Sequence, residues 1–136
     1  MIRFSANLGF LWTDRPLPDA IVAAAAAGFD AVECHMPYSY DPMEISTVLT
    51  QVGIPMVGMN THHEGPEFGL AAIPGREVEA RDQIDKAFAY ATTMGCPNVS
   101  LMAGRTGRAP GSENAYRSNL AYAAERASAH GCTLLL

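Results

Sequence analysis

The sequence predicts an alternating α/β protein with a parallel sheet, organised as somewhat more than half of a closed (β/α)8 barrel. Four glycines, Gly28, Gly53, Gly95 and Gly131, each separate a helix-like segment from a short apolar strand. Glycine often follows the last turn of a helix, because the backbone there takes a left-handed conformation. The 136 residues hold four βα units and a fifth strand at 134–136, whereas a closed barrel needs eight units and typically ~250 residues. We therefore expect residues 1–136 to form a single, incomplete domain, a truncated barrel.

The boundaries of the expected elements follow from turn residues and apolar patterns. Pro18 and Asp19 favour the start of the first helix, because proline is tolerated in a first turn and a carboxylate suits its positive end. Asp41 is placed to cap the second helix. The expected helices are 21–27, 42–51, 76–94 and 112–129, and the expected strands are 2–7, a strand ending at 33, 56–60, 99–102 and 134–136.

The two later helices carry apolar side chains at helical spacing, which predicts the faces that they bury. We expect the third helix to bury Val78, Ile84, Phe88 and Ala91, and the fourth to place Tyr116, Leu120, Ala123, Ala124 and Ala127 on one side. The segment 61–75 is long for a connection in this fold class, which makes it a candidate for function.

Composition bounds the possible partners. The net charge is −5 and Lys86 is the only lysine, which argues against a nucleic-acid surface built of clustered Lys and Arg. No apolar run reaches the ~18 residues of a membrane span, so no membrane is expected as a partner. The three cysteines lie near predicted strands, at Cys34, Cys96 and Cys132. This placement is typical of small buried core residues in a protein of a reducing compartment. The sequence thus predicts a cytoplasmic protein.

Polar residues gather where the predicted strands end. In parallel α/β sheets, ligands bind at the carboxyl ends of the strands. Six such positions would face one mouth, and their mixture of acceptors, donors and one cation suits a small polyhydroxylated or carboxylated molecule: Asn7, Glu33, His35, Asn60, His62 and Arg105. As substrate-binding residues we select Asn7, Glu33, Asn60, His62 and Arg105.

Each of these residues also has a simpler interpretation. Glu33 could only pair with a cation such as Arg3, and Asn60 could be a turn residue. The run 62–64 (His-His-Glu) resembles a metal site, but adjacent residues on an extended chain point to opposite faces, so we expect no metal ligand here. Arg105 is preferred to Arg108 because it is nearer the strand. The segment 104–107 lacks the spacing of a phosphate loop, and no nucleophile–base signature is present.

Four motifs resemble the N-terminal half of hydroxypyruvate isomerase, a family of the sugar isomerase and epimerase group with a xylose-isomerase-like barrel. The resemblance covers the whole chain in order, and residues 73–77 (Ile-Pro-Gly-Arg-Glu) are its most specific part. The other motifs are residues 4–8 (Phe-Ser-Ala-Asn-Leu), 28–33 (Gly-Phe-Asp-Ala-Val-Glu) and 37–38 (Pro-Tyr).

The resemblance implies interconversion of hydroxypyruvate and tartronate semialdehyde through an enediol. In the family, two carboxylates on later strands act as acid and base with a divalent metal, Mg or Mn, between them. These groups would follow Leu136, so the catalytic residues are unknown here, and we expect the chain alone to be inactive and to bind no metal.

Two other interpretations remain open. The chain could be a non-catalytic half-barrel that binds a ligand or self-associates through the open edges of its sheet. A third, weaker interpretation is the related barrel of DNA-repair endonucleases, whose zinc ligands include histidines at several strand ends. Here the fourth strand is followed by Met102-Ala103-Gly104 without a histidine.

Overall fold

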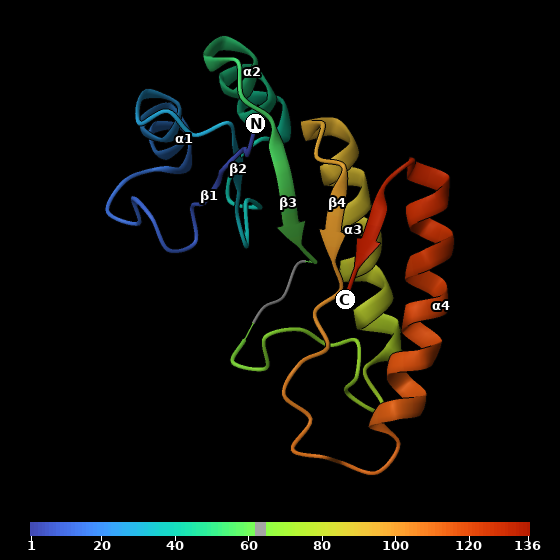
Figure 1. Ribbon diagram of the computed structural model, residues 1–136. Helices are drawn as coiled ribbons and strands as arrows, with labels where there is room; N and C mark the ends of the chain where they lie inside the picture. Colours follow the sequence, from blue (N-terminus) through green and yellow to red (C-terminus); the bar gives the residue numbers. More distant parts are fainter. Residues whose placement is uncertain (62–64) are drawn as a thin grey trace.

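The computed structural model of the chain describes residues 1–61 and 65–136, and it shows one parallel sheet with helices between its strands (Figure 1). The strand order is β1-β2-β3-β4-β5, and each strand is parallel to its neighbour. The α/β class and the half-barrel arrangement are confirmed. The elements are β1 (Ser5–Asn7), α1 (Leu17–Ala26), β2 (Ala31–Glu33), α2 (Pro42–Val52), β3 (Met56–Asn60), α3 (Glu77–Met94), β4 (Asn98–Ser100), α4 (Ser112–His130) and β5 (Thr133–Leu135).

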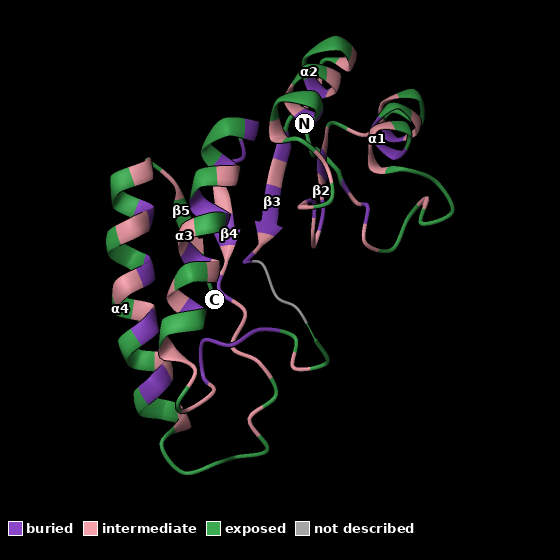
Figure 2. Ribbon diagram, turned by 180° about the vertical axis from the view of Figure 1, so that it is seen from behind, coloured by how far each residue is buried: buried purple, intermediate pink, exposed green. Residues whose placement is uncertain are grey.

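The hydrophobic core lies between the sheet and its helices. Alternate strand residues are fully buried, among them Ala6, Val32, Met56 and Val99, at 0–1% exposure. They meet the apolar sides of the helices, whose buried residues are purple in Figure 2. In β1, β2 and β4, the residues on either side of them are less buried, among them Asn7, Glu33 and Ser100. Since successive side chains of a strand point to opposite faces, these residues line the face that no helix of the described chain covers.

Local sequence rules account for the ends of the helices. Gly53, Gly95 and Gly131 are left-handed C-caps, with φ of 76°, 86° and 65°. Gly28 has φ of 87° one residue beyond the cap of α1. The expected glycine stops are therefore confirmed. At the other end of α2, Asp41 Oδ1 accepts a hydrogen bond of 2.7 Å from the backbone N–H of Met43, as the capping prediction requires.

Several predicted boundaries were wrong by a few residues. The first strand begins at Ser5 rather than at residue 2, because only Ser5–Asn7 have partners in β2. The first helix begins at Leu17, four residues earlier than expected. The fourth strand ends at Ser100 rather than at residue 102, because the chain then turns to pair with the 65–76 segment.

Two predicted core positions were also wrong. Val78 is 84% exposed, because α3 is 18 residues long and its first turn extends past the short strands. Ala124 is exposed, since the buried stripe of α4 is Ala115, Asn119, Ala123 and Ala127.

The segments that follow β3 and β4 pair with each other. Gly69 and Ala103 form an antiparallel bridge, and the backbone N–H of Ala72 donates to Ala103 O at 2.7 Å. The two chains approach so closely that a Cβ at Gly104 would lie 2.3 Å from the carbonyl oxygen of Gly69. Glycine is required there. The long connection is thus held against its neighbour at the carboxyl edge of the sheet.

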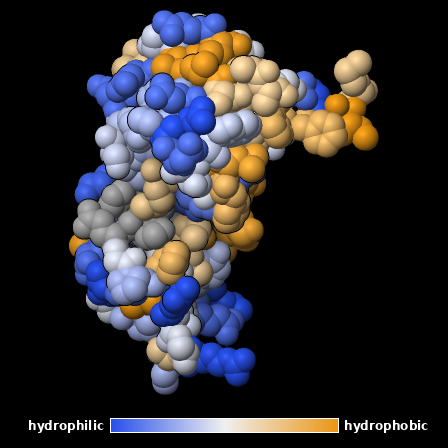
Figure 3. Space-filling model, turned by 90° about the vertical axis from the view of Figure 1, so that its left-hand side faces the viewer, coloured by the Kyte–Doolittle hydropathy of each residue, from blue (hydrophilic) through white to orange (hydrophobic). Residues whose placement is uncertain are grey.

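Large apolar side chains are exposed at both outer strands. Near β1, Ile2 is 80% and Phe4 is 64% exposed, and at β5 Leu135 is 41% exposed. Figure 3, which views the molecule from the β1 side, shows hydrophobic groups gathered along its hollowed side. Among residues 1–61 and 65–136, none of the helices combines the length and the apolar character that a membrane span requires.

Candidate functional site

The carboxyl ends of the first four strands bring polar side chains onto the open face of the sheet. Asn7 of β1 is in register with Glu33 of β2, and Asn60 of β3 is in register with Ser100 of β4. All four are partly buried, in contrast to their fully buried neighbours on the helix side. The structure therefore places Asn7, Glu33 and Asn60 along one edge and on one face.

Glu33 is the carboxylate of this row, and a glycine makes room for it. Its register partner in β3 is Gly58, and a Cβ at Gly58 would lie 3.6 Å from Glu33 Oε2. In the described part of the chain, neither Arg3 nor another cation lies within ion-pair distance of the Glu33 carboxylate. The simpler interpretation of Glu33 as an ion-pair partner of Arg3 is not realised in the structure.

Asn7 fixes the orientation of His35. The Oδ1 atom of Asn7 accepts the backbone N–H of Gly9 at 2.8 Å, so the amide must turn its Nδ2 donor toward His35 Nε2, 3.3 Å away. Nε2 of His35 is then the acceptor in this hydrogen bond. The ring lies over Gly9, where a Cβ would come within 2.4 Å of Nδ1, and its edge meets Phe10.

The backbone of Asn60 makes hydrogen bonds to the segment that follows β2. Its side chain belongs to the row of polar residues on the open face of the sheet. Its N–H donates to His35 O at 3.1 Å, and its carbonyl accepts the hydroxyl of Tyr38. The Tyr38 ring packs edge-on against Tyr90 at 5.1 Å. The Tyr90 hydroxyl shares its hydrogen between the carbonyls of Pro37 and Tyr40, both 2.9 Å away. Burial is the main cause that raises the pKa of Tyr90.

Arg105 lies on the paired loops, five residues beyond the end of β4. Its backbone N–H donates to Glu67 O at 2.7 Å, and its guanidinium carbon lies 4.4 Å from the centre of the Phe68 ring. The side chain is exposed. The remaining predicted site residue, His62, and with it the run 62–64, lies outside the described residues.

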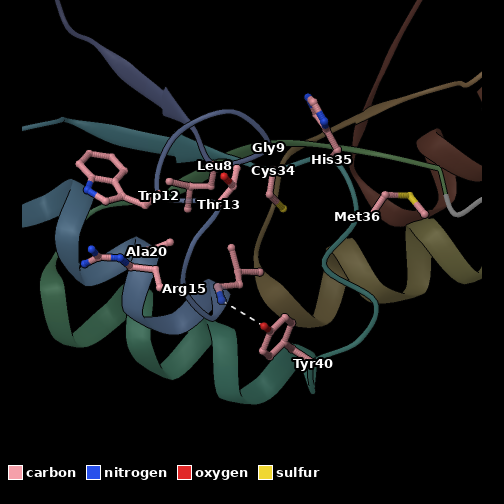
Figure 4. A pocket seen from close by; sticks show the side chains of 11 residues that line it. Leu8, Gly9, Trp12, Thr13, Arg15, Ala20, Cys34, His35, Met36 and Tyr40 are labelled. Atoms are coloured by element: carbon pink, nitrogen blue, oxygen red, sulfur yellow. Dashed lines mark hydrogen bonds between the residues drawn. The ribbon is translucent and has the colours of Figure 1, made fainter.

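A cavity of about 300 Å³ lies behind this edge, between the segments that follow β1 and β2 (Figure 4). In this view, the Cys34 sulfur and the His35 ring point to opposite sides of the chain. Burial, together with nearby Cys96 and Glu33, raises the pKa of the Cys34 thiol to about 12, so this group is inert at neutral pH. The lining residues are Leu8, Gly9, Trp12, Thr13, Arg15, Leu17, Ala20, Cys34, His35, Met36 and Tyr40.

The two glycines that shape the site, Gly9 and Gly58, are not among the residues predicted from the sequence. Gly58 lies inside β3, and a glycine within a strand is a known signal of close approach by another group. Gly9 makes room for the His35 ring, but the sequence alone does not reveal this contact, because the two residues are 26 positions apart.

Within the described part of the chain, no three His, Cys, Asp or Glu side chains come together closely enough to hold a metal ion. In the register of the sheet, Glu33 lies beside the amide of Asn7 on one side and beside Gly58 on the other, with no further carboxylate. The described residues therefore do not fit a divalent metal, and no step through a metal is derived for them.

The fold and this edge together define a parallel α/β protein of the barrel type, with a polar site at the carboxyl ends of its strands. Residues 21–136 match the model of one family, described as the xylose isomerase-like TIM barrel. The chain belongs to the xylose isomerase-like TIM barrel family.

Curated relatives of this chain are named as isomerases. It is 38% identical to the 2-oxo-tetronate isomerase of Pectobacterium atrosepticum over all of its length and 54% of the relative's. It is 34% identical to the hydroxypyruvate isomerase of Escherichia coli, again over its whole length and 55% of the relative's. A putative hydroxypyruvate isomerase of Mus musculus is 41% identical over 76% of this chain and 39% of the relative. The chain thus spans about half the length of the relatives that it matches.

The same holds for solved structures. A crystal structure named AP endonuclease, family 2, from Brucella melitensis superposes with a TM-score of 0.93 at 35% identity, covering 98% of this chain and 54% of that one. The D-allulose 3-epimerase of Methylomonas sp. superposes with a TM-score of 0.75 at 16% identity, covering 98% of this chain and 50% of that one, which shows the shared fold alone.

Proposed function

We propose that this chain forms the front half of the active site of an isomerase that interconverts hydroxypyruvate and tartronate semialdehyde. The observation that carries the proposal is the row of Asn7, Glu33 and Asn60 on the open face, in a chain whose curated relatives are named as isomerases of 2-oxo acids. In the reaction, a base removes a proton from the hydroxymethyl carbon of hydroxypyruvate. An enediol forms, and return of a proton to the former carbonyl carbon gives the aldehyde.

In this proposal, the residues of the chain bind and orient the substrate. The Glu33 carboxylate accepts hydrogen bonds from substrate hydroxyls, and the amides of Asn7 and Asn60 donate to its oxygens or accept from them. A carboxylate facing hydroxyl groups at fixed distance discriminates strongly, because a substrate without the hydroxyl leaves a polar group unpaired. The acid and base carboxylates, and the ligands of a divalent metal such as Mg or Mn, would be residues outside this chain.

The expected location and the kind of ligand follow from the composition of the chain. Three free cysteines suit a cytoplasmic protein. A net charge of −5 with a single lysine favours a small-molecule ligand over nucleic acid or an anionic membrane surface.

The test joins residues 1–136 to the second half of the Pectobacterium atrosepticum 2-oxo-tetronate isomerase. We expect the joined protein to convert hydroxypyruvate, and Glu33→Gln to lower kcat/KM by about 10-fold or more, since it removes a charged acceptor. The 136-residue chain alone should show no turnover, with or without added magnesium or manganese. Turnover by the isolated chain, or a joined protein that folds but is inactive on hydroxypyruvate and on 2-oxo-tetronate, would count against the proposal.

The name of the Brucella structure favours a second candidate, action on abasic DNA. A duplex-binding surface requires several Lys or Arg side chains to neutralise phosphates. Of the nine basic side chains, four are instead paired with carboxylates of their own helix or of a neighbouring one, a fifth, Arg15, is paired with Asp14, and the total charge is acidic. Cleavage of a duplex with one abasic site by the joined protein, at rates above its isomerase activity, would support this candidate in place of the isomerase.

A further inference from the structure

Arg105 differs from most basic side chains of the described chain in what its guanidinium contacts. Five others lie within ion-pair distance of a carboxylate: Arg15 and Asp14, Arg76 and Glu79, Lys86 and Asp82, Arg117 and Glu113, Arg126 and Asp85. Arg105 instead lies on the face of Phe68, and no carboxylate of the described residues is within ion-pair distance of it. Its positive charge is therefore not neutralised by the part of the chain that the structure describes.

The contact with Phe68 leaves the hydrogen-bonding edge of the guanidinium available. All five N–H donors of arginine lie in the plane of the group, whereas a ring 4.4 Å away from its central carbon occupies the face. A planar carboxylate approaching that edge can accept two parallel hydrogen bonds, the arrangement that arginine makes best. Stacking thus holds the cation in place without using the donors that would bind an anion.

The backbone around this pair is held in a constrained form. Phe68 has φ of 58°, which is rare for a bulky residue and persists only where the surroundings impose it. The surroundings are the bond from Arg105 N to Glu67 O at 2.7 Å and the close contact between Gly69 and Gly104. The pairing of the two loops therefore fixes the backbone positions of both Arg105 and Phe68.

The paired loops are tied directly to the polar row. The hydroxyl of Thr61, which follows Asn60, accepts the backbone N–H of Met102 at 3.0 Å, and Thr61 N–H donates to Ser100 O at 2.9 Å. Arg105 follows three residues after Met102, at the carboxyl edge of the same sheet. The paired loops therefore begin at the carboxyl ends of β3 and β4, the strands that carry Asn60 and Ser100 of the polar row.

We propose that Arg105, stacked on Phe68, is the specificity-determining residue that binds the carboxylate of the substrate, so that the site selects oxo acids over neutral sugars. The inference rests on the proposed function for the identity of the substrate. In this division, the row on the sheet binds the hydroxyl and carbonyl end, and the guanidinium binds the carboxylate end.

The test compares two ligands that differ in the group that Arg105 would bind. Hydroxypyruvate and dihydroxyacetone share the hydroxymethyl ketone, but only the first has a carboxylate. In the 136-residue chain, we expect hydroxypyruvate to shift the NMR signal of the Arg105 side-chain N–H, and dihydroxyacetone to leave it in place. The absence of such a shift at millimolar hydroxypyruvate would overturn the proposal.

Three variants distinguish the loss of the contact between Arg105 and the substrate carboxylate from a general effect on the fold or charge of the chain. Arg105→Met should weaken hydroxypyruvate binding by about 10-fold or more, and Arg105→Lys, which keeps the charge but loses the two-pronged geometry, by a smaller factor. Binding of dihydroxyacetone should change less than about 2-fold. The matched control is Arg108→Met, because Arg108 is an exposed arginine of the same loop, three residues further along the chain. Equal losses for Arg105→Met and Arg108→Met would indicate a general charge effect and overturn the inference.

The same variants in the joined protein distinguish this inference from the proposed function. Isomerase turnover with a KM for hydroxypyruvate that Arg105→Met leaves unchanged would refute the role of Arg105 and keep the isomerase. Binding of hydroxypyruvate that depends on Arg105, without any isomerisation, would refute the isomerase and keep the carboxylate site.

Discussion

The carboxylate of Glu33 lies beside Gly58, its register partner across β2 and β3, where Oε2 would be 3.6 Å from a Cβ on the glycine. That distance is an ordinary van der Waals contact, so a methyl group fits, whereas the branches of a larger side chain would reach the carboxylate. Alanine can also adopt the backbone conformation at residue 58, because the φ of Gly58 is not positive. The size of residue 58 therefore controls the position of Glu33.

We expect Gly58→Ala to keep activity in the joined protein within about 3-fold, while Gly58→Val lowers kcat/KM by about 10-fold or more by displacing the carboxylate. Alanine should leave stability unchanged or raise it by up to ~1 kcal/mol, because a strand glycine costs entropy. Steady-state kinetics and urea unfolding of both variants measure the two effects. Equal activity of the valine and alanine variants would show that Glu33 does not need this space.

The buried thiol of Cys34 predicts a loss of stability in alkali. Its pKa is raised to about 12 in the folded protein, mainly by burial, against an unfolded value of about 8.5. The folded state therefore keeps a proton that the unfolded state releases, so the stabilisation is complete below about pH 8.5 and declines as pH rises toward 12. The expected loss is about 3 kcal/mol by pH 11.

Urea unfolding at pH 8 and at pH 10–11 measures this decline, and Cys34→Ala should make it shallower. Part of it should remain in the variant, because burial also raises the pKa of Cys96, to about 11, and that of Tyr90. A pH dependence identical in the variant and in the parent chain would show that Cys34 ionises normally.

The junction of the two loops predicts a contrast between two glycines. Gly104 and Gly75 have similar backbone angles, φ of 90° and 80°, so alanine is strained at both. Only at Gly104 would the added Cβ meet another backbone, 2.3 Å from Gly69 O, whereas no atom lies within 4 Å of a Cβ at Gly75. The pair separates the cost of the backbone angle from the cost of the close approach.

We expect Gly75→Ala to lower the free energy of unfolding by about 1 kcal/mol, the usual cost of a left-handed alanine. Gly104→Ala should lower it by about 1–3 kcal/mol more, because overlap forces the loops apart. The same variant should shift the NMR signal of the Arg105 side chain, since the stack on Phe68 depends on the junction. Equal effects of the two substitutions on stability would contradict the close contact.

Local patterns predicted the elements of this fold but not the contacts between its loops. Glycine stops, the Asp41 cap and the strand at 56–60 depend on neighbouring residues, and the structure has all of them. The stack of Arg105 on Phe68 joins residues 37 positions apart, and no local rule reports such a pairing. The buried Asn119 is similar, because its Nδ2 donates to the carbonyl of Ala71, 48 residues earlier, at 2.8 Å.

The misplaced core residues have the same origin. Helical spacing identifies an apolar stripe, but the length of the helix relative to the strands decides which part of that stripe meets the sheet. Val78 lies on the predicted stripe of α3 and yet extends past the sheet. In α4 the buried stripe contains polar Asn119, which a search for apolar residues alone passes over.

The two outer strands predict self-association of the chain. β1 pairs only with β2, and β5 only with β4, among the described residues, so each has an edge without a neighbouring strand. Phe4 and Leu135, exposed at 64% and 41%, lie beside those edges. An unpaired edge with apolar side chains is a template for pairing with another chain. We therefore expect light scattering at micromolar concentration to show a dimer or a larger species.

Charged substitutions identify the surface responsible. Phe4→Lys and Leu135→Lys should each shift the distribution toward monomer, because a lysine on an edge strand opposes pairing through its charge and hydration. Val78→Lys is the matched control, since Val78 is apolar and 84% exposed but lies on α3, away from both edges. A loss of association in the control as large as in the edge variants would indicate nonspecific hydrophobic contact. A monomer of the parent chain that unfolds in one sharp thermal transition would show instead that the open sheet is stable by itself.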